Sequence, residues 1–232
     1  MNFPAADGRA ETGLKSNMLP ILDSEEVRVL GALLEKEATT PEYYPMSLNA
    51  LVNACNQKSN RHPVVAYDDE IVLQAIDRLR DKKMSAVIVG GGRVNKYAQR
   101  FSELLNLGRR ELALMCTLLL RGPQTLGELA GRSERMHAFE DLDAVEHTLD
   151  KLANHESGRL VMKLPKAPGQ KEARYAHLLS GEPAEEDLAT YAQIGPPQSG
   201  DRITVLENQV AELRYEVGEL RRQLEEFQRQ FS

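Results

Sequence analysis

The chain contains four short segments twice, in the same order in both halves. Residues 26–34 are echoed by 111–119, 47–51 by 125–129, 58–61 by 132–135, and 96–98 by 174–176. The offsets are 85, 78, 74 and 78 residues, so the repeating unit has the length of a small domain. We therefore expect two copies of one fold. A duplicated module is typical of a binding scaffold, because an active site is more often built once.

Each copy has the pattern of three helices followed by two short strands. Apolar residues at helical spacing, capping residues and prolines set the expected bounds of these elements. In the first copy one helix is expected to start at Asp23 or Ser24 and to be ended by Thr40-Pro41 and Pro45. The others are expected from the Ser47 cap to Cys55 and from about Asp68 to Lys82, with strands over 86–89 and 93–97. In the second copy the helices are expected over 109–120, 125–131 and 140–155, with strands over 160–164 and 173–177. Three helices followed by a hairpin is the winged-helix plan. The predicted fold class is mainly α, with small β-hairpin wings.

The first helix should bury a single apolar stripe, formed by Val27, Leu30, Leu33 and Leu34. The two cysteines, Cys55 and Cys116, each fall on the apolar face of a predicted helix. We interpret them as buried thiols and not as metal ligands or nucleophiles, because their spacing pairs them with no other ligand.

A heptad pattern runs through the C-terminal residues without a break. β-branched residues at most core a positions and Leu at most d positions favour a parallel two-stranded coiled coil, hence a homodimer. Two charge pairs, Arg202 with Glu207 and Glu216 with Arg221, would be attractive in that register. A single helix that packs back on its own modules is the alternative. The expected dimerisation residues are Ile203, Leu206, Val210, Leu213, Val217, Leu220, Leu224 and Phe227, and Phe231 extends the seam.

These patterns divide the chain into five parts. We expect a disordered leader over 1–20, winged-helix modules over 21–101 and 102–180, a linker over 181–201 and the coiled-coil helix over 202–232. The longest apolar run, 112–120, is too short to span a membrane, and the first 17 residues lack the apolar region of a secretion signal. We therefore expect a cytoplasmic protein that does not associate with membranes.

The sequence shows no pattern that predicts catalysis, a metal or a cofactor. The five histidines lack metal-ligand spacing, and Gly90-Gly91-Gly92 is interpreted as a hairpin turn between two strands. The carboxylates of Asp68, Asp69 and Glu70 fall at a helix N-terminus, where they offset the helix dipole. We expect a protein that is not an enzyme.

Residues 55–64 and 132–137, together with Glu35-Lys36, Thr39-Thr40-Pro41 and 121–125, give the chain a specific likeness. It resembles the YceH-like family of uncharacterised bacterial proteins over about residues 20 to 180. The resemblance implies a tandem winged-helix fold, often with a C-terminal coiled tail. It implies no known activity.

The charge distribution decides where a nucleic acid could bind. Residues 21–100 carry 11 basic and 11 acidic side chains and residues 101–182 carry 11 and 12, so both modules are about neutral. The outward face of each third helix is acidic and would repel phosphates, whereas basic residues lie in the repeated turns and on the wings. The expected phosphate contacts are Lys58, Arg61, Lys96, Arg132, Arg135, Lys163, Lys166, Lys171 and Arg174.

Three interpretations of this surface stay open. The repeated turns could instead be structural, with the Ser capping a helix and the Arg pairing with a carboxylate of its own module. We favour a dimeric nucleic-acid-associated protein, DNA-binding or similar to a transcription regulator, that contacts mostly phosphate. The alternative is a protein-interaction scaffold, comparable to the accessory subunits of chromosome-condensing complexes.

Overall fold

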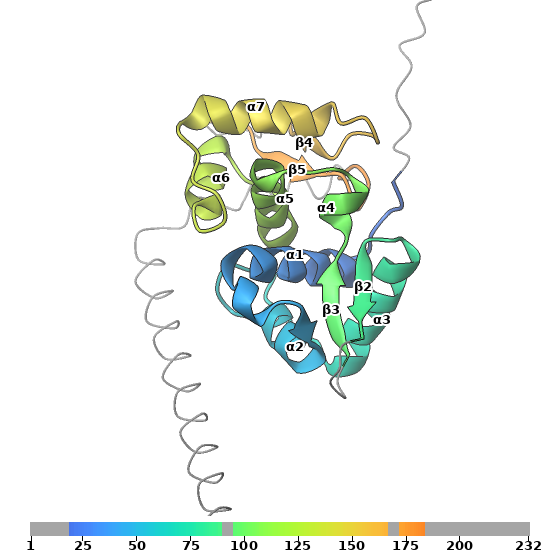
Figure 1. The fold of residues 1–232 in the computed structure, drawn as a ribbon. Helices are drawn as coiled ribbons and strands as arrows, with labels where there is room; N and C mark the ends of the chain where they lie inside the picture. Colours follow the sequence, from blue (N-terminus) through green and yellow to red (C-terminus); the bar gives the residue numbers. More distant parts are fainter. Residues whose placement is uncertain (1–18, 90–94, 167–171, 184–232) are drawn as a thin grey trace, which may run out of the picture.

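The computed structural model describes residues 19–89, 95–166 and 172–183, which form a mainly helical protein with small antiparallel sheets (Figure 1). The first half contains α1 (Ser24–Thr39), η1 (Pro41–Tyr43), β1 (Met46–Ser47), α2 (Leu48–Cys55), α3 (Asp69–Asp81), β2 (Ser85–Ile88) and β3 (Lys96–Gln99). The second half contains α4 (Phe101–Leu104), α5 (Arg109–Arg121), α6 (Leu126–Ser133), α7 (Leu142–Ala153), β4 (Val161–Lys163) and β5 (Tyr175–His177).

Side-chain caps fix the starts of most of these helices, as the sequence predicts. Asp23 and Glu26 form a reciprocal capping box at α1, and Thr125 and Glu128 form another at α6. Ser47 caps α2 with a single hydrogen bond, which its hydroxyl oxygen accepts from the backbone N–H of Ala50. These bonds satisfy backbone N–H groups that have no partner within the first turn of a helix.

The sheets reproduce the repeat. In the first half the order is β1-β3-β2, and Met46 of β1 lies opposite Tyr97 of β3. In the second half an isolated bridge joins Gln124 to Tyr175 beside the β4–β5 pair. Both pairs are separated by the 78-residue offset that the sequence shows, so the duplication extends to strand pairing.

The two halves pack against each other through α1 and α5, and buried residues of both helices belong to one continuous apolar core (Figure 1). Gly31 allows the close approach, because a Cβ there would lie 2.8 Å from Cδ2 of Leu120. Cys116, its counterpart at the offset of 85, donates its thiol hydrogen to the Gly31 carbonyl at 3.4 Å. The expected single stripe on α1 is therefore incomplete: the helix is buried on nearly all sides from Glu26 to Leu34.

Other sequence-based bounds differ from the structure by a few residues. The second wing strand of the first half is Lys96–Gln99 and not 93–97, and the third helix of the second half begins at Leu142, after an N-cap at Asp141. The short elements η1, β1 and α4 were not predicted, because two to four residues carry no periodicity. The heptad residues 203–231 lie outside the described residues.

Among the residues that the structure describes, no helix is both long and apolar enough to cross a bilayer. Both cysteines are buried free thiols, as predicted. Burial raises the pKa of Cys55 to about 12, so this thiol stays protonated and unreactive at neutral pH.

Candidate functional site at the junction of the two halves

Arg61, one of the predicted phosphate contacts, lies inside the protein. Its side chain is fully buried, and its Nη2 atom lies 2.6 Å from Oε2 of Glu35 on α1. The guanidinium also donates two hydrogen bonds, from Nε and Nη2, to the carbonyl of Ala54 at the end of α2. Arg61 thus ties α2 to α1. The structural interpretation of this turn is correct for the arginine, whereas neither Ser59 nor Ser133 caps a helix.

The loop that carries Arg61 also contacts the second half. The backbone N–H of His62 donates to the carbonyl of Leu120 at 2.8 Å, and the guanidinium of Arg121 donates to Oδ1 of Asn60. Asn60 has a φ of +61°, in the left-handed region that Asn tolerates better than most residues. The loop between α2 and α3 therefore belongs to the junction, where it covers the C-terminal end of α5.

A second buried arginine, Arg28, holds the same loop in place by hydrogen bonds to backbone carbonyls. Arg28 of α1 is 4% exposed, and its two terminal nitrogens donate to the carbonyls of Cys55 and Pro63. Burial lowers the pKa of Arg28, and the nearby Arg61 adds to this lowering. Sequence reasoning missed Arg28, because a single charge on an apolar helix face is ordinarily assigned to the solvent side.

In the second half, two more of the predicted contacts converge on Glu128. Arg174 of the wing lies 2.7 Å from Glu128 Oε2 and donates to the carbonyl of Pro123. Arg132 lies 3.3 Å from Glu128 Oε1 and also donates to the side-chain oxygen of Gln124. These two arginines fix the wing strand and the start of α6. The prediction that they belong to an exposed basic surface is therefore wrong.

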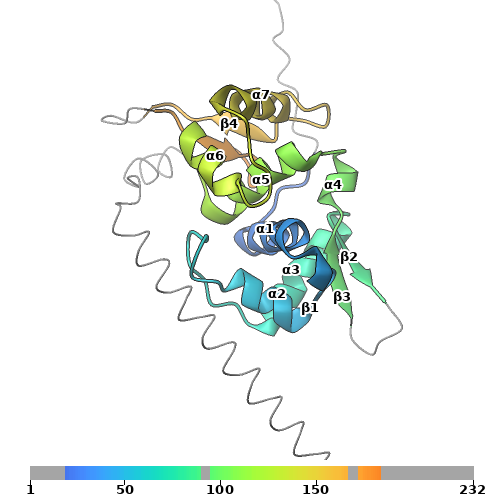
Figure 2. The ribbon, with the colours of Figure 1, turned by 60° about the vertical axis from the view of Figure 1, so that its left-hand side comes forward.

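The remaining predicted contacts are exposed but do not form one surface. Lys58, Lys96, Arg135, Lys163 and Lys166 are exposed, and Lys171 lies outside the described residues. Lys163 pairs with Glu146 at 3.4 Å, and its Nζ lies 5.4 Å from the centre of the Tyr175 ring. Figure 2 shows the outer ends of β2–β3 and β4–β5 on opposite sides of the molecule. The described parts of the two hairpins therefore do not present their lysines on one common side.

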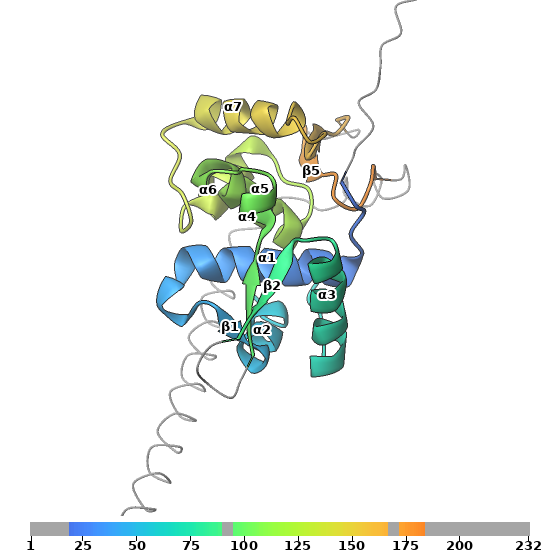
Figure 3. The same cartoon turned by 45° about the vertical axis from the view of Figure 1, so that its right-hand side comes forward.

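The outward faces of the third helices are acidic, as the sequence predicts. Asp69 and Glu70 are exposed at the start of α3, which stands along one side of the first half in Figure 3. Asp143 and Asp150 are exposed on α7. Arg78, also on α3, pairs with Asp23 and Glu25 near the start of α1.

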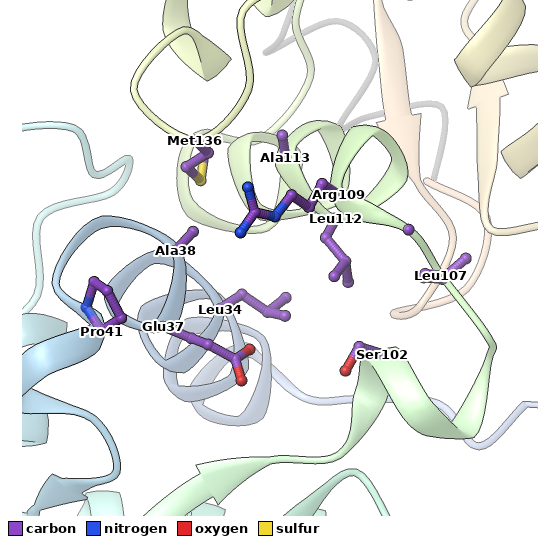
Figure 4. A pocket seen from close by; sticks show the side chains of 11 residues that line it. Leu34, Glu37, Ala38, Pro41, Ser102, Leu107, Arg109, Leu112, Ala113 and Met136 are labelled. Carbon is purple, nitrogen blue, oxygen red and sulfur yellow. The ribbon is translucent and has the colours of Figure 1, made fainter.

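The junction contains two pockets on either side of the α1–α5 contact. The larger, of about 520 Å³, has apolar walls that include Leu34 and Leu112, with polar groups from Glu37, Ser102 and Arg109 at its edges (Figure 4). Burial raises the pKa of Glu37, although its carboxylate accepts a 2.6 Å hydrogen bond from the Gln99 side chain.

The smaller pocket, of about 270 Å³, is lined by both charged and apolar residues and lies where the two repeated turns meet. Its walls come from α1, from the Asn60 loop, from the end of α5 and from the end of α6. Burial alone would raise the pKa of the Glu35 carboxyl, but the bonded Arg61 guanidinium and Lys36 hold that pKa below its ordinary value. Burial, together with the neighbouring Arg132 and Arg61, lowers the pKa of Arg121 to about 10.

No group of three or more histidine, cysteine or carboxylate side chains with metal-binding geometry occurs within 19–89, 95–166 and 172–183. The sequence identified Arg61 and Arg132 as special but did not identify Glu35 or Arg121, which complete the junction. Their only signal was their place in segments that carry the family likeness, Glu35-Lys36 and 121–125.

These features define a class of helical protein in which two related halves share a core and leave pockets at their junction. The chain belongs to the family described as a protein of unknown function, DUF480, whose model matches residues 22–170. This agrees with the likeness seen in the sequence. A UPF0502 protein of Solibacter usitatus is 59% identical over 195 residues, which cover 83% of this chain and 93% of the relative. A UPF0502 protein of Citrifermentans bemidjiense is 52% identical over 191 residues, which cover 82% and 88%.

Proposed function

We propose that this chain is a non-enzymatic protein-interaction scaffold built from two winged-helix modules. The observation that carries the proposal is the acidic outward face of α3 and α7. A winged helix ordinarily places its third helix in the major groove, where carboxylates would face phosphates and forfeit the favourable release of counterions. A partner protein with a basic surface suits the same faces.

The buried arginines support this proposal, because the side chains best suited to bind phosphate already form ion pairs inside the protein. Arg61 and Arg174 are bound to carboxylates of their own halves, at 2.6 and 2.7 Å. Removing them from those sites to bind DNA would deprive the half-buried carboxylates of Glu35 and Glu128 of their closest partners, which is costly. The shared core holds the two acidic helices in a fixed relation, as a scaffold requires.

The scaffold is tested by photo-crosslinking in cells of the native source. A photoreactive amino acid replaces Gln74 on α3 or His147 on α7, both of which are exposed. We expect one defined protein adduct from these positions. Reversing the charge at Asp143 and Asp150 should remove it, and a probe at exposed Glu42, which lies on η1 and not on α3 or α7, serves as the control. The scaffold proposal would be contradicted if the control probe gave the same protein adduct in the same yield, or if the adducts contained nucleic acid.

Nucleic-acid association is the second candidate, and the five exposed basic residues of the wings and turns favour it. It is tested by fluorescence anisotropy with a random-sequence duplex, titrated across salt. On the scaffold proposal we expect no binding at low salt. If binding occurs and weakens linearly with log salt at a slope worth several phosphates, charge reversal of Lys163, Lys166 and Lys171 together should flatten that slope.

We further propose that the chain is a homodimer through a parallel coiled coil of residues 202–232. The heptad seam supports this, because an exposed monomeric helix would leave a long apolar stripe in water. Light scattering after size exclusion should give twice the chain mass of 25.9 kDa. Replacement of Val210 and Val217 by Asp should give the monomer mass, whereas a monomer in the unaltered protein would favour a helix that packs on its own modules.

A further inference from the structure

We propose that the smaller junction pocket binds a compact oxyanion, namely inorganic phosphate or the phosphoryl group of a small phosphate ester. This site is independent of the protein partner proposed above. It lies between the two halves and is bounded by helices from both, so one ligand there would contact both copies of the repeat.

The pocket has more positive charge than its carboxylates balance. Three arginines line it, Arg121, Arg132 and Arg135, against the carboxylates of Glu35 and Glu134. Glu35 is already engaged by both terminal nitrogens of Arg61, at 3.1 and 2.6 Å. The charge of Glu35 is therefore largely matched by a residue other than the three that line the pocket.

Arg121 is the strongest candidate for the ligand contact. Among the described residues, its guanidinium donates one hydrogen bond, to the neutral amide oxygen of Asn60, and forms no ion pair with a carboxylate. The side chain is half-buried, and its pKa is lowered to about 10 by burial and by the neighbouring arginines. A half-buried guanidinium without a bound carboxylate is stabilised by an anion that supplies the missing acceptor oxygens.

Arg135 also lines this pocket. It is exposed, and it forms no ion pair within 19–89, 95–166 and 172–183. Its long side chain can therefore give a second guanidinium contact to an anion that Arg121 holds. The side chain of Arg132 is already bound to Glu128 and Gln124. Arg132 therefore attracts the anion through its positive charge and not through a direct hydrogen bond.

The volume restricts the ligand class. About 270 Å³ lies at the small end of ligand-binding cavities, so the pocket admits a phosphate ion or a small ester but not a complete nucleotide. The planar donors of an arginine match the oxygens of a phosphoryl group in pairs, which favours phosphate over a spherical halide.

The proposal is tested by calorimetric titration of the full chain with inorganic phosphate, glycerol phosphate and malonate, at constant ionic strength set by chloride. We expect saturable binding of phosphate with a Kd at or below about 1 mM. Two charge-assisted hydrogen bonds from guanidinium groups should keep this affinity even when dissolved salt screens the charges. Binding of phosphate but not of its ester assigns the free ion. Preferential binding of the ester assigns a small metabolite. Preferential binding of malonate, or no saturable heat with any of the three, would overturn the proposal.

Three variants assign any binding to this pocket. Arg135→Gln, an exposed position that leaves the core intact, should weaken phosphate binding about tenfold, on the order of one lost charge-assisted contact. Arg121→Gln should abolish it. Lys58→Gln is the matched control. Lys58 is exposed in the loop between α2 and α3 and is not among the residues that line the pocket, so this variant should leave the Kd unchanged.

A site-specific readout covers the case in which Arg121→Gln unfolds the junction. In the unaltered protein, the Nε–Hε resonance of Arg121 should shift with phosphate along the same saturation curve as the heat. An Arg121 resonance that stays in place while phosphate binds would show that the site lies elsewhere.

Discussion

The two halves repeat the same elements, yet basic residues at equivalent positions differ in burial: where one is buried, its counterpart is exposed. Arg61 is buried and Arg135 is exposed, although both end an echoed basic turn. On the wings the order is reversed, because Lys96 is exposed while Arg174 is buried. A sequence echo therefore predicts the local fold of each copy but not the environment of its charged side chains.

The difference arises from one loop. The connection between the second and third helices covers residues 56–68 in the first half but only 134–141 in the second. As a result, Lys58 to Arg61 lie in a loop beyond α2, whereas Arg132 and Ser133 still belong to α6. The longer loop reaches α5 and turns Arg61 inward, and no equivalent segment does so for Arg135.

The largest expected effect separates Arg61 from Arg135. Arg61→Ala should destabilise the protein by about 3 to 5 kcal/mol, because it leaves the carboxylate of Glu35 enclosed without its partner. Arg135→Ala should change stability by less than about 0.5 kcal/mol. Urea denaturation of both variants measures the contrast. Equal costs would mean that the Arg61–Glu35 pair contributes nothing specific.

The next contrast concerns the ends of the wings, where His177 stands at the position of Gln99. Nδ1 of His177 is buried and without a hydrogen bond in the structure, and burial lowers the pKa of this residue to about 4. The unfolded state, with an ordinary pKa near 6.5, then takes up a proton first as the pH falls. The stabilisation is complete above pH 6.5 and is lost between pH 6.5 and 4.

The total loss should be about 3 kcal/mol, since one pKa unit corresponds to roughly 1.4 kcal/mol. Denaturation midpoints at pH 7.0, 6.0 and 5.0 check it. The range above pH 5 is informative because the carboxyl groups of Glu35 and Asp23, with lowered pKa values, titrate below it. The matched variant His177→Gln should remove this pH dependence. An unaltered pH profile in the variant would assign the effect to other groups.

A smaller effect tests the contact at which the halves meet. Gly31→Ala should cost about 1 to 3 kcal/mol, because the new methyl group would collide with Leu120 in a packed interior. Gly127→Ala is the control, since nothing lies within 4 Å of its added Cβ and the helix gains stability by up to about 1 kcal/mol. Thermal denaturation gives both values. A neutral Gly31→Ala would show that α1 and α5 can separate without cost.

The smallest expected effect compares the caps of the second helices. Ser47→Ala should cost about 1 kcal/mol, and Thr125→Ala somewhat more, within the range of roughly 0.5 to 2 kcal/mol for lost caps. Thr125 should be worth more because its partner Glu128 also binds Arg132 and Arg174. A larger cost for Ser47→Ala in urea denaturation would contradict this ranking.

Much of the fold was predictable because it depends on local patterns. The caps at Asp23, Ser47 and Thr125 and the burial of Val145, Leu149 and Leu152 follow from residue type and spacing alone. The candidate site was predictable only in part. Arg61 and Arg132 stood out by repetition, but nothing near them in the sequence identifies Glu35 or Arg121 as neighbours.

The sequence by itself determined the duplication, the order of helices and strands, the strand offset of 78 residues and the acidic character of the third helices. The tertiary structure alone decided which arginines are buried, because the carboxylates that pair with Arg61 and Arg174 lie 26 and 46 residues away, on other elements. It also decided that the halves share one core, because the contact between α1 and α5 depends on shape at Gly31 and not on any local propensity. Long-range packing thus converts two similar segments into one internal support and one exposed residue.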